Sequence, residues 1–77
     1  MELSDAVKER YQDRDEWLYL EDFDETNVFF WKEDALFMAS YKLNRNDEYI
    51  VAETAKEVEK DWLYVETAKV LISDKAL

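Results

Sequence analysis

The spacing of apolar side chains changes once along the chain, from a helical period to an alternating one. The apolar residues near the start recur at helical spacing and are Leu3, Ala6, Val7 and Tyr11. Ser4 is a favourable N-cap, and Asp5 suits the positive end of a helix dipole. The pattern therefore predicts a short amphipathic helix from Leu3 to about Tyr11.

After this helix the chain consists of short aromatic and β-branched segments separated by polar clusters, which is typical of strands and turns. The predicted strands are Trp17 to Phe23, Val28 to Lys32, Ala35 to Leu43 and Tyr49 to about Glu53. The polar runs between them are short, and short connections favour an antiparallel meander. Because the chain has neither glycine nor proline, its turns must be built from Asn, Asp and other charged residues.

The last third of the chain fits two structures. As a hairpin, segments 49–58 and 62–72 would pair across residues 59–61. As a helix, it would be capped by Thr54 and Glu57, and its apolar side would consist of Ala55, Val58, Trp62, Val65 and Ile72. We favour the hairpin, because two glutamates would enter the apolar side of that helix and residues 62–65 are rich in strand formers.

A length of 77 residues indicates a single domain, and the pattern predicts the α+β class. The expected architecture is a short N-terminal helix followed by a four- to five-stranded antiparallel meander. In the first strand, Trp17, Tyr19 and Phe23 face one way, while Leu18 and Leu20 face the other. Either the sheet closes as a small barrel, or some aromatic surface stays exposed for a partner because the helix is too short to cover it.

Charge narrows the class of partner. Twenty acidic and ten basic residues give a net charge of −10, and nine acids against two bases lie between Asp13 and Asp34. Such a chain repels nucleic acid and anionic lipid and suits a basic surface. We therefore expect the basic surface of a host or phage protein as partner, with no direct nucleic acid and no membrane contact. A homodimer is compatible with the same pattern.

Missing residue types exclude several chemistries. The chain has no Cys or His for a disulfide or a zinc site, and no Gly for a P-loop, a dinucleotide-binding turn or an EF-hand. Neighbouring carboxylates can serve hydrolysis, but among twenty acids such neighbours are unavoidable, and a chain this short leaves little room for a cleft. We predict a protein that is not an enzyme and has no catalytic residues, no cofactor and no metal.

The acidic cluster and a nearby tryptophan form the candidate partner-binding site. Alternate side chains on a strand lie about 6.6 Å apart, so Asp22 and Asp24 would carry two charges at a spacing similar to that of backbone phosphates. Such a row could occupy the basic groove of a DNA-binding protein, and it would equally suit a solvated strand end. The selected residues, expected to be solvated and dispensable for folding, are Glu21, Asp22, Asp24, Glu25, Glu33 and Asp34, with Trp31 as aromatic anchor.

Two resemblances point to tailed phages. Residues 17–25, 28–30, 41, 47–51 and 58–59, including Trp17-Leu18-Tyr19-Leu20 and Asp22-Phe23-Asp24, resemble a β-rich segment of phage head-assembly proteins. In size and acidity the chain is similar to the small inhibitors that phages make against host DNA enzymes, the uracil-DNA glycosylase inhibitors and other DNA mimics. These resemblances imply a phage-encoded inhibitor of a host nucleic-acid-binding protein or nuclease, located in the host cytoplasm. The alternative is a structural or assembly component of the phage particle, located in the virion.

Overall fold

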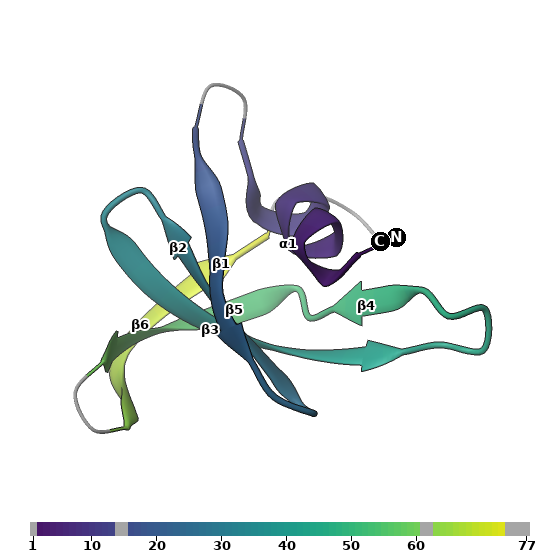
Figure 1. Cartoon of the computed structure of the whole chain (residues 1–77). Coiled ribbons are helices and arrows are strands. Elements are labelled where there is room, and N and C mark those ends of the chain that lie inside the picture. Colours follow the sequence, from purple (N-terminus) through teal and green to yellow (C-terminus); the bar gives the residue numbers. More distant parts are fainter. Residues whose placement is uncertain (1, 14–15, 61–62, 74–77) are drawn as a thin grey trace.

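The computed structural model describes residues 2–13, 16–60 and 63–73, most of which lie in strands (Figure 1). The elements are α1 (Leu3–Tyr11), β1 (Leu18–Phe23), β2 (Asn27–Lys32), β3 (Ala35–Leu43), β4 (Tyr49–Val51), β5 (Thr54–Lys60) and β6 (Tyr64–Ile72). The predicted α+β class with four or five strands is therefore wrong, and the fold is mainly β with one short helix. The additional strand arises because the segment after β3 divides into β4 and β5, which pair with different parts of β3.

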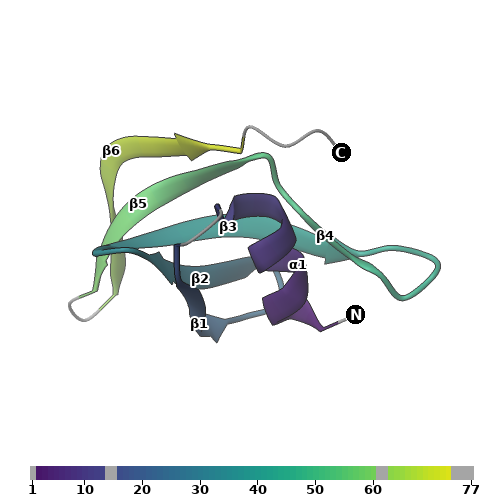
Figure 2. The ribbon, with the colours of Figure 1, turned by 90° about the horizontal axis from the view of Figure 1, so that it is seen from above.

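The six strands form one open antiparallel sheet in the order β1-β2-β3-β5-β6, with β4 paired to the outer part of β3. No ladder joins the edge strands β1 and β6 within the described residues, so the barrel considered from the sequence does not form. The β3–β4 hairpin extends beyond the rest of the sheet (Figure 1), and β5 and β6 bend together along their length (Figure 2). Because β5 and β6 pair as a hairpin, the helical alternative for the last third is wrong.

Helix α1 covers one side of the sheet and forms the main core with it. Its buried side chains are those that the helical spacing predicted, Leu3, Ala6, Val7 and Tyr11. The Tyr11 ring stacks on Phe30 with centroids 5.0 Å apart, and its hydroxyl donates a hydrogen bond to the Ala52 carbonyl. The predicted N-cap is wrong, because Ser4 lies inside a helix that begins at Leu3 without a side-chain cap.

The other side of the sheet carries a second, smaller cluster that the β5–β6 hairpin covers in part. Its buried members are Phe29, Leu36 and Val58, with Trp31, Met38 and Tyr64 packed against them. The Tyr64 ring lies on Phe29 with centroids 3.7 Å apart, so β6 reaches across the sheet to β2. Phe29 and Trp31 thus face away from Val28 and Phe30, as the alternation along this strand predicted.

A β-bulge interrupts the ladder between β1 and β2 just after Leu20, where Glu21 has no opposite residue. Beyond the bulge, Phe23 pairs with Val28, whose side chain lies on the helix side of the sheet. The alternation in the sequence placed Phe23 on the same side as Trp17. That prediction is wrong, because the extra residue in the bulge reverses the side on which the end of β1 presents its side chains.

The turns of this glycine-free chain use polar side chains as acceptors for backbone N–H groups. In the β3–β4 turn, the Asn44 side-chain oxygen accepts the N–H groups of Asn46 and Glu48 at 2.8 and 3.0 Å. Positive φ angles occur at Glu33 (56°), Asp47 (59°) and Ala68 (77°). These positions carry a backbone conformation that glycine would adopt with less steric strain.

Candidate partner-binding surface

The acidic residues selected from the sequence fall into two groups at opposite ends of β2. Asp24 and Glu25 lie in the turn from β1 to β2, and Asp22 lies just before it in β1, opposite Phe29. We call these three residues the β1–β2 acidic end. Glu33 and Asp34 form the turn from β2 to β3, and we call them the β2–β3 acidic end. All five are exposed, and the length of β2 separates the two turns by about 17 Å. The fold therefore presents an acidic group at each end of β2 in place of the single row expected from the sequence.

Asp24 has a structural role in the β1–β2 turn. Its carboxylate accepts the backbone N–H groups of Thr26 at 2.8 Å and of Asn27 at 2.7 Å, and the Thr26 hydroxyl at 3.2 Å. These hydrogen bonds hold the pKa of Asp24 below its ordinary value. Asp24 thus stabilises the turn, contrary to the expectation that every acid of this cluster is dispensable for folding.

Glu21 and Trp31 contact each other on the side of the sheet that faces away from α1. The Trp31 Nε1–H donates a hydrogen bond to Glu21 Oε2 at 2.9 Å, and Lys60 Nζ lies 3.4 Å from Glu21 Oε1. Glu21 therefore fixes the orientation of the indole, and Lys60 partly neutralises its charge. The half-buried Trp31 is a positioned side chain, as an anchor would need, but it is not freely exposed.

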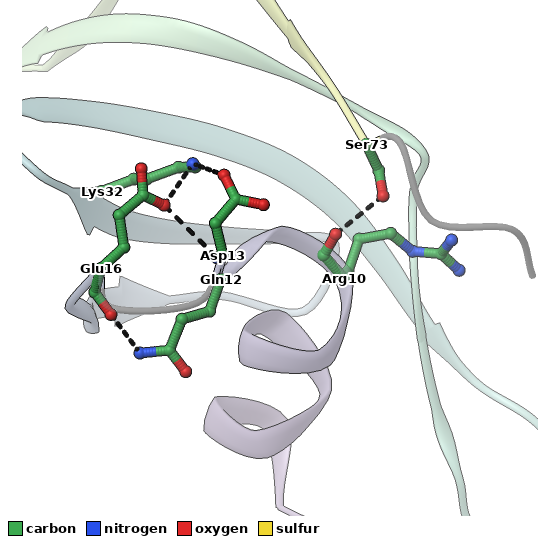
Figure 3. A network of polar contacts seen from close by, with 6 residues as sticks. All are labelled: Arg10, Gln12, Asp13, Glu16, Lys32 and Ser73. Atoms are coloured by element: carbon green, nitrogen blue, oxygen red, sulfur yellow. Dashed lines mark hydrogen bonds and ion pairs between the residues drawn. The ribbon is translucent and has the colours of Figure 1, made fainter.

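The β2–β3 acidic end adjoins a polar network that joins β2 to the segment between α1 and β1 (Figure 3). Lys32 Nζ lies 3.0 Å from Asp13 Oδ2 and 2.6 Å from Glu16 Oε2. Burial lowers the pKa of Lys32, but hydrogen bonds and charge from the two carboxylates outweigh burial and raise that pKa above its ordinary value. Hydrogen bonding with Glu16, together with the like charge of Glu16, raises the pKa of the Glu33 carboxyl. Carboxylates are therefore crowded at this end even though one lysine is present.

The selected site omitted two exposed aromatic side chains beside Trp31. Trp17 and Tyr19 stack with centroids 5.0 Å apart and are 53% and 49% exposed. Tyr19 is the cross-strand partner of Trp31, so the three rings share one side of the sheet, and we call them the aromatic strip. The sequence contained the signal, because Trp17 and Tyr19 alternate with the buried Leu18. The third tryptophan, Trp62, lies outside the described residues.

A groove of about 520 Å³ opens beside Trp31, between the β2–β3 turn and β5. The buried side chains of Leu36 and Val58 lie next to Trp31 in its lining. The charged residues that line it are Asp34, Glu57, Glu59 and Lys60. The groove thus combines apolar and aromatic surface with a net negative rim.

This surface has the chemistry of a binding site for cationic groups. Carboxylates at the ends of β2 and at the groove attract positive charge, and the faces of aromatic rings attract cations. Within the described part of the chain, no three acidic side chains converge as ligands for a metal ion. The arrangement suits recognition of lysine or arginine groups on a partner.

In comparisons with known proteins, no family model, no curated protein and no solved structure matches the chain. No helix among the described residues is long and apolar enough to cross a bilayer. The resemblance to phage proteins stays a prediction.

Proposed function

We propose that the protein is an acidic binding protein that inhibits a nucleic-acid-binding protein or nuclease by occupying its basic nucleic-acid site. The observation that carries this proposal is the exposure of carboxylates at both ends of β2, with the aromatic strip on the same hairpin. The ion pairs among the described residues join Lys32 to Asp13 and Glu16, Lys56 to Glu66, and Lys60 to Glu21. They leave the carboxylates of Glu25 and Asp34 available for a partner's cations, whereas the Asp22 carboxylate also accepts the backbone N–H of Phe23 at 2.8 Å.

The division of the acids into two ends supports mimicry of a nucleic acid. Proteins contact the phosphates of a duplex at separate positions with lysine and arginine, and these contacts set the orientation of the bound duplex. Two acidic ends about 17 Å apart offer charge to such divided cationic groups, while the aromatic strip offers contact area that loses its water when a partner covers it. The similarity of composition to phage inhibitors makes a bacterial host protein the first class of target to test.

The experiment is capture of partners from a bacterial lysate on the immobilised protein, at about 50 and about 500 mM salt. A captured protein should bind nucleic acid on its own and release it when this protein is added. The doubly substituted variant Glu25→Gln/Asp34→Asn removes one charge from each end and should lose that competition. Its matched control, Glu2→Gln/Glu9→Gln, removes two exposed charges at and before α1 and should retain it.

A partner that keeps its nucleic acid in the presence of this protein would contradict inhibition by site occupation. Equal losses in the two double variants would also contradict the proposal, because they would show that net charge alone drives binding and that its placement on β2 is irrelevant.

The edge strand β6 favours a second candidate function, a structural or assembly component of a phage particle. Four exposed apolar side chains lie on or next to β6: Leu63 (76%), Val65 (56%), Val70 (55%) and Ile72 (69%). An edge strand of this kind can pair with a strand of another chain. The irregular ladder around Ala68, where φ is 77°, makes such pairing less favourable. Size in solution separates the two functions, because an inhibitor stays a discrete monomer or dimer while an assembly component grows with concentration.

A further inference from the structure

We propose that the groove beside Trp31 binds an arginine side chain, presented by an extended basic segment of the partner. This inference rests on the proposed function and names the group through which the partner's basic surface is recognised. The groove volume of about 520 Å³ lies within the range of sites that enclose small ligands, about 300–1,000 Å³, so it has room for one long side chain.

The aromatic and apolar lining favours a guanidinium over an ammonium group. Trp31 is held in place by the hydrogen bond from its indole N–H to Glu21 at 2.9 Å, and Leu36 and Val58 beside it are each 3% exposed. A guanidinium is planar and weakly hydrated, so it stacks on an aromatic face at a smaller desolvation penalty than the compact, strongly hydrated lysine ammonium. A preformed indole surface of this kind therefore selects arginine.

The charges at the rim complement a cation. Asp34 comes from the β2–β3 turn and Glu59 from β5, and both are exposed acidic residues of the lining whose negative charge attracts a cation. Lys60, the basic residue in the lining, lies 3.4 Å from Glu21, which offsets its charge. Glu57 accepts a hydrogen bond from the Thr67 hydroxyl at 3.1 Å and contributes a further negative charge.

Neighbouring structure indicates how the segment approaches. The next side chain on this side of β2, Phe29, is buried under Tyr64. The opposite neighbours, Tyr19 and Trp17 on the β1 side, are exposed and stacked. An extended segment that crosses the sheet from β1 therefore meets aromatic surface before its arginine enters the groove, which makes the aromatic strip a continuation of the same site.

The test uses NMR titration of the intact protein with three end-capped peptides, tetra-arginine, tetralysine and tetracitrulline. The Trp31 indole N–H signal and the methyl signals of Leu36 and Val58 report directly on the groove. Tetra-arginine should shift these signals and bind about three- to tenfold more tightly than tetralysine, because only the guanidinium both stacks and pairs. Tetracitrulline, which keeps the shape but lacks the charge, should shift them little.

Two matched variants test whether tetra-arginine binding depends on the charges of the groove. Asp34→Asn/Glu59→Gln removes two rim charges and should weaken tetra-arginine binding about three- to tenfold. Glu9→Gln/Glu48→Gln removes two exposed charges, one on α1 and one in the β3–β4 turn, and should leave tetra-arginine binding nearly unchanged. Thermal unfolding of both variants checks that each remains folded.

Several results would overturn the inference. Equal affinity for tetra-arginine and tetralysine would contradict the selection of arginine by stacking on Trp31. Equal weakening of binding by the two variants would show that the groove is not the binding site. Signals of Trp31 that shift with protein concentration alone would show that a second copy of the chain occupies the groove. In each case lysate capture and nucleic-acid competition still report separately on the proposed function. That function fails if no basic partner is captured, if no nucleic acid is released, or if its own two double variants lose competition equally.

Discussion

Replacing Tyr11 by phenylalanine tests how α1 is joined to the sheet. The phenol ring is 3% exposed and stacks on Phe30, and its hydroxyl donates to the Ala52 carbonyl between β4 and β5. The Tyr11→Phe variant keeps the stacked ring and removes only the hydroxyl. A hydrogen bond of this kind contributes about 0.5–1.5 kcal/mol net, so the variant should be about 1 kcal/mol less stable near neutral pH.

The same hydroxyl makes the difference depend on pH. Burial, opposed by the charge of Arg10 and assisted by that of Glu53, raises the pKa of Tyr11 from 10.0 to about 12. Below pH 10 the phenol is protonated in the folded and unfolded chains, and its contribution to stability is complete. As pH rises from 10 towards 12, the unfolded chain releases this proton first, and the contribution is lost. A difference of two pKa units corresponds to a loss of about 2.7 kcal/mol in the free energy of unfolding. Screening by solvent lowers the expected loss to about 1–2 kcal/mol.

The assay is urea unfolding of both proteins, followed by tryptophan fluorescence between pH 8 and 11. The free energy of unfolding of the variant should be lower by about 1 kcal/mol at pH 8, and the gap should close near pH 11. Other groups titrate equally in both proteins and cancel in the difference. A gap that is the same at every pH, or a variant more stable than the natural sequence at pH 8, would refute this account of Tyr11.

Three further predictions concern the exposed surface and its turns. Trp17→Ala should lower the free energy of unfolding by only about 1 kcal/mol, because the ring is 53% exposed, and it should weaken partner capture. The core variant Phe30→Ala should lower the free energy of unfolding, measured by chemical unfolding, by about 3–5 kcal/mol. Asp24→Ala should lower the melting temperature more than Glu25→Ala, since only Asp24 is seen to accept the turn N–H groups, and equal melting temperatures would contradict that role. Because the pKa of Asp24 is lowered, its stabilisation is present at neutral pH and should disappear as pH falls through its folded pKa. Association with a basic partner, measured by stopped flow, should slow markedly between about 50 and 500 mM salt, and a rate independent of salt would exclude electrostatic steering.

The features of the fold that follow from the amino-acid sequence alone are local ones. The bounds of α1 and its buried residues followed from the helical spacing of Leu3, Ala6, Val7 and Tyr11. An amphipathic helix carries its apolar residues along one side, and that side must pack against the sheet. The opposite directions of Phe29 and Phe30 followed from the two-residue period of a strand. The sequence left open whether the sheet closes as a barrel or keeps aromatic surface exposed, and Trp17 and Tyr19 are exposed because the sheet stays open and a nine-residue helix covers only one of its sides.

Features that depend on how the strands pair are visible only in the folded chain. The bulge at Glu21 turns Phe23 to the helix side, and alternation along one strand cannot reveal it, because a bulge is defined by two strands together. Asp24 and Asp34 are ten positions apart in the sequence and looked like one cluster, yet β2 runs between them and places them at opposite ends. The groove beside Trp31 exists because β5 pairs with β3, where Phe37 lies opposite Glu57, and bends towards β1, where Lys60 reaches Glu21 across 39 positions of sequence. Local patterns set which residues seek burial, while long-range pairing sets which of the remaining charges and rings become neighbours.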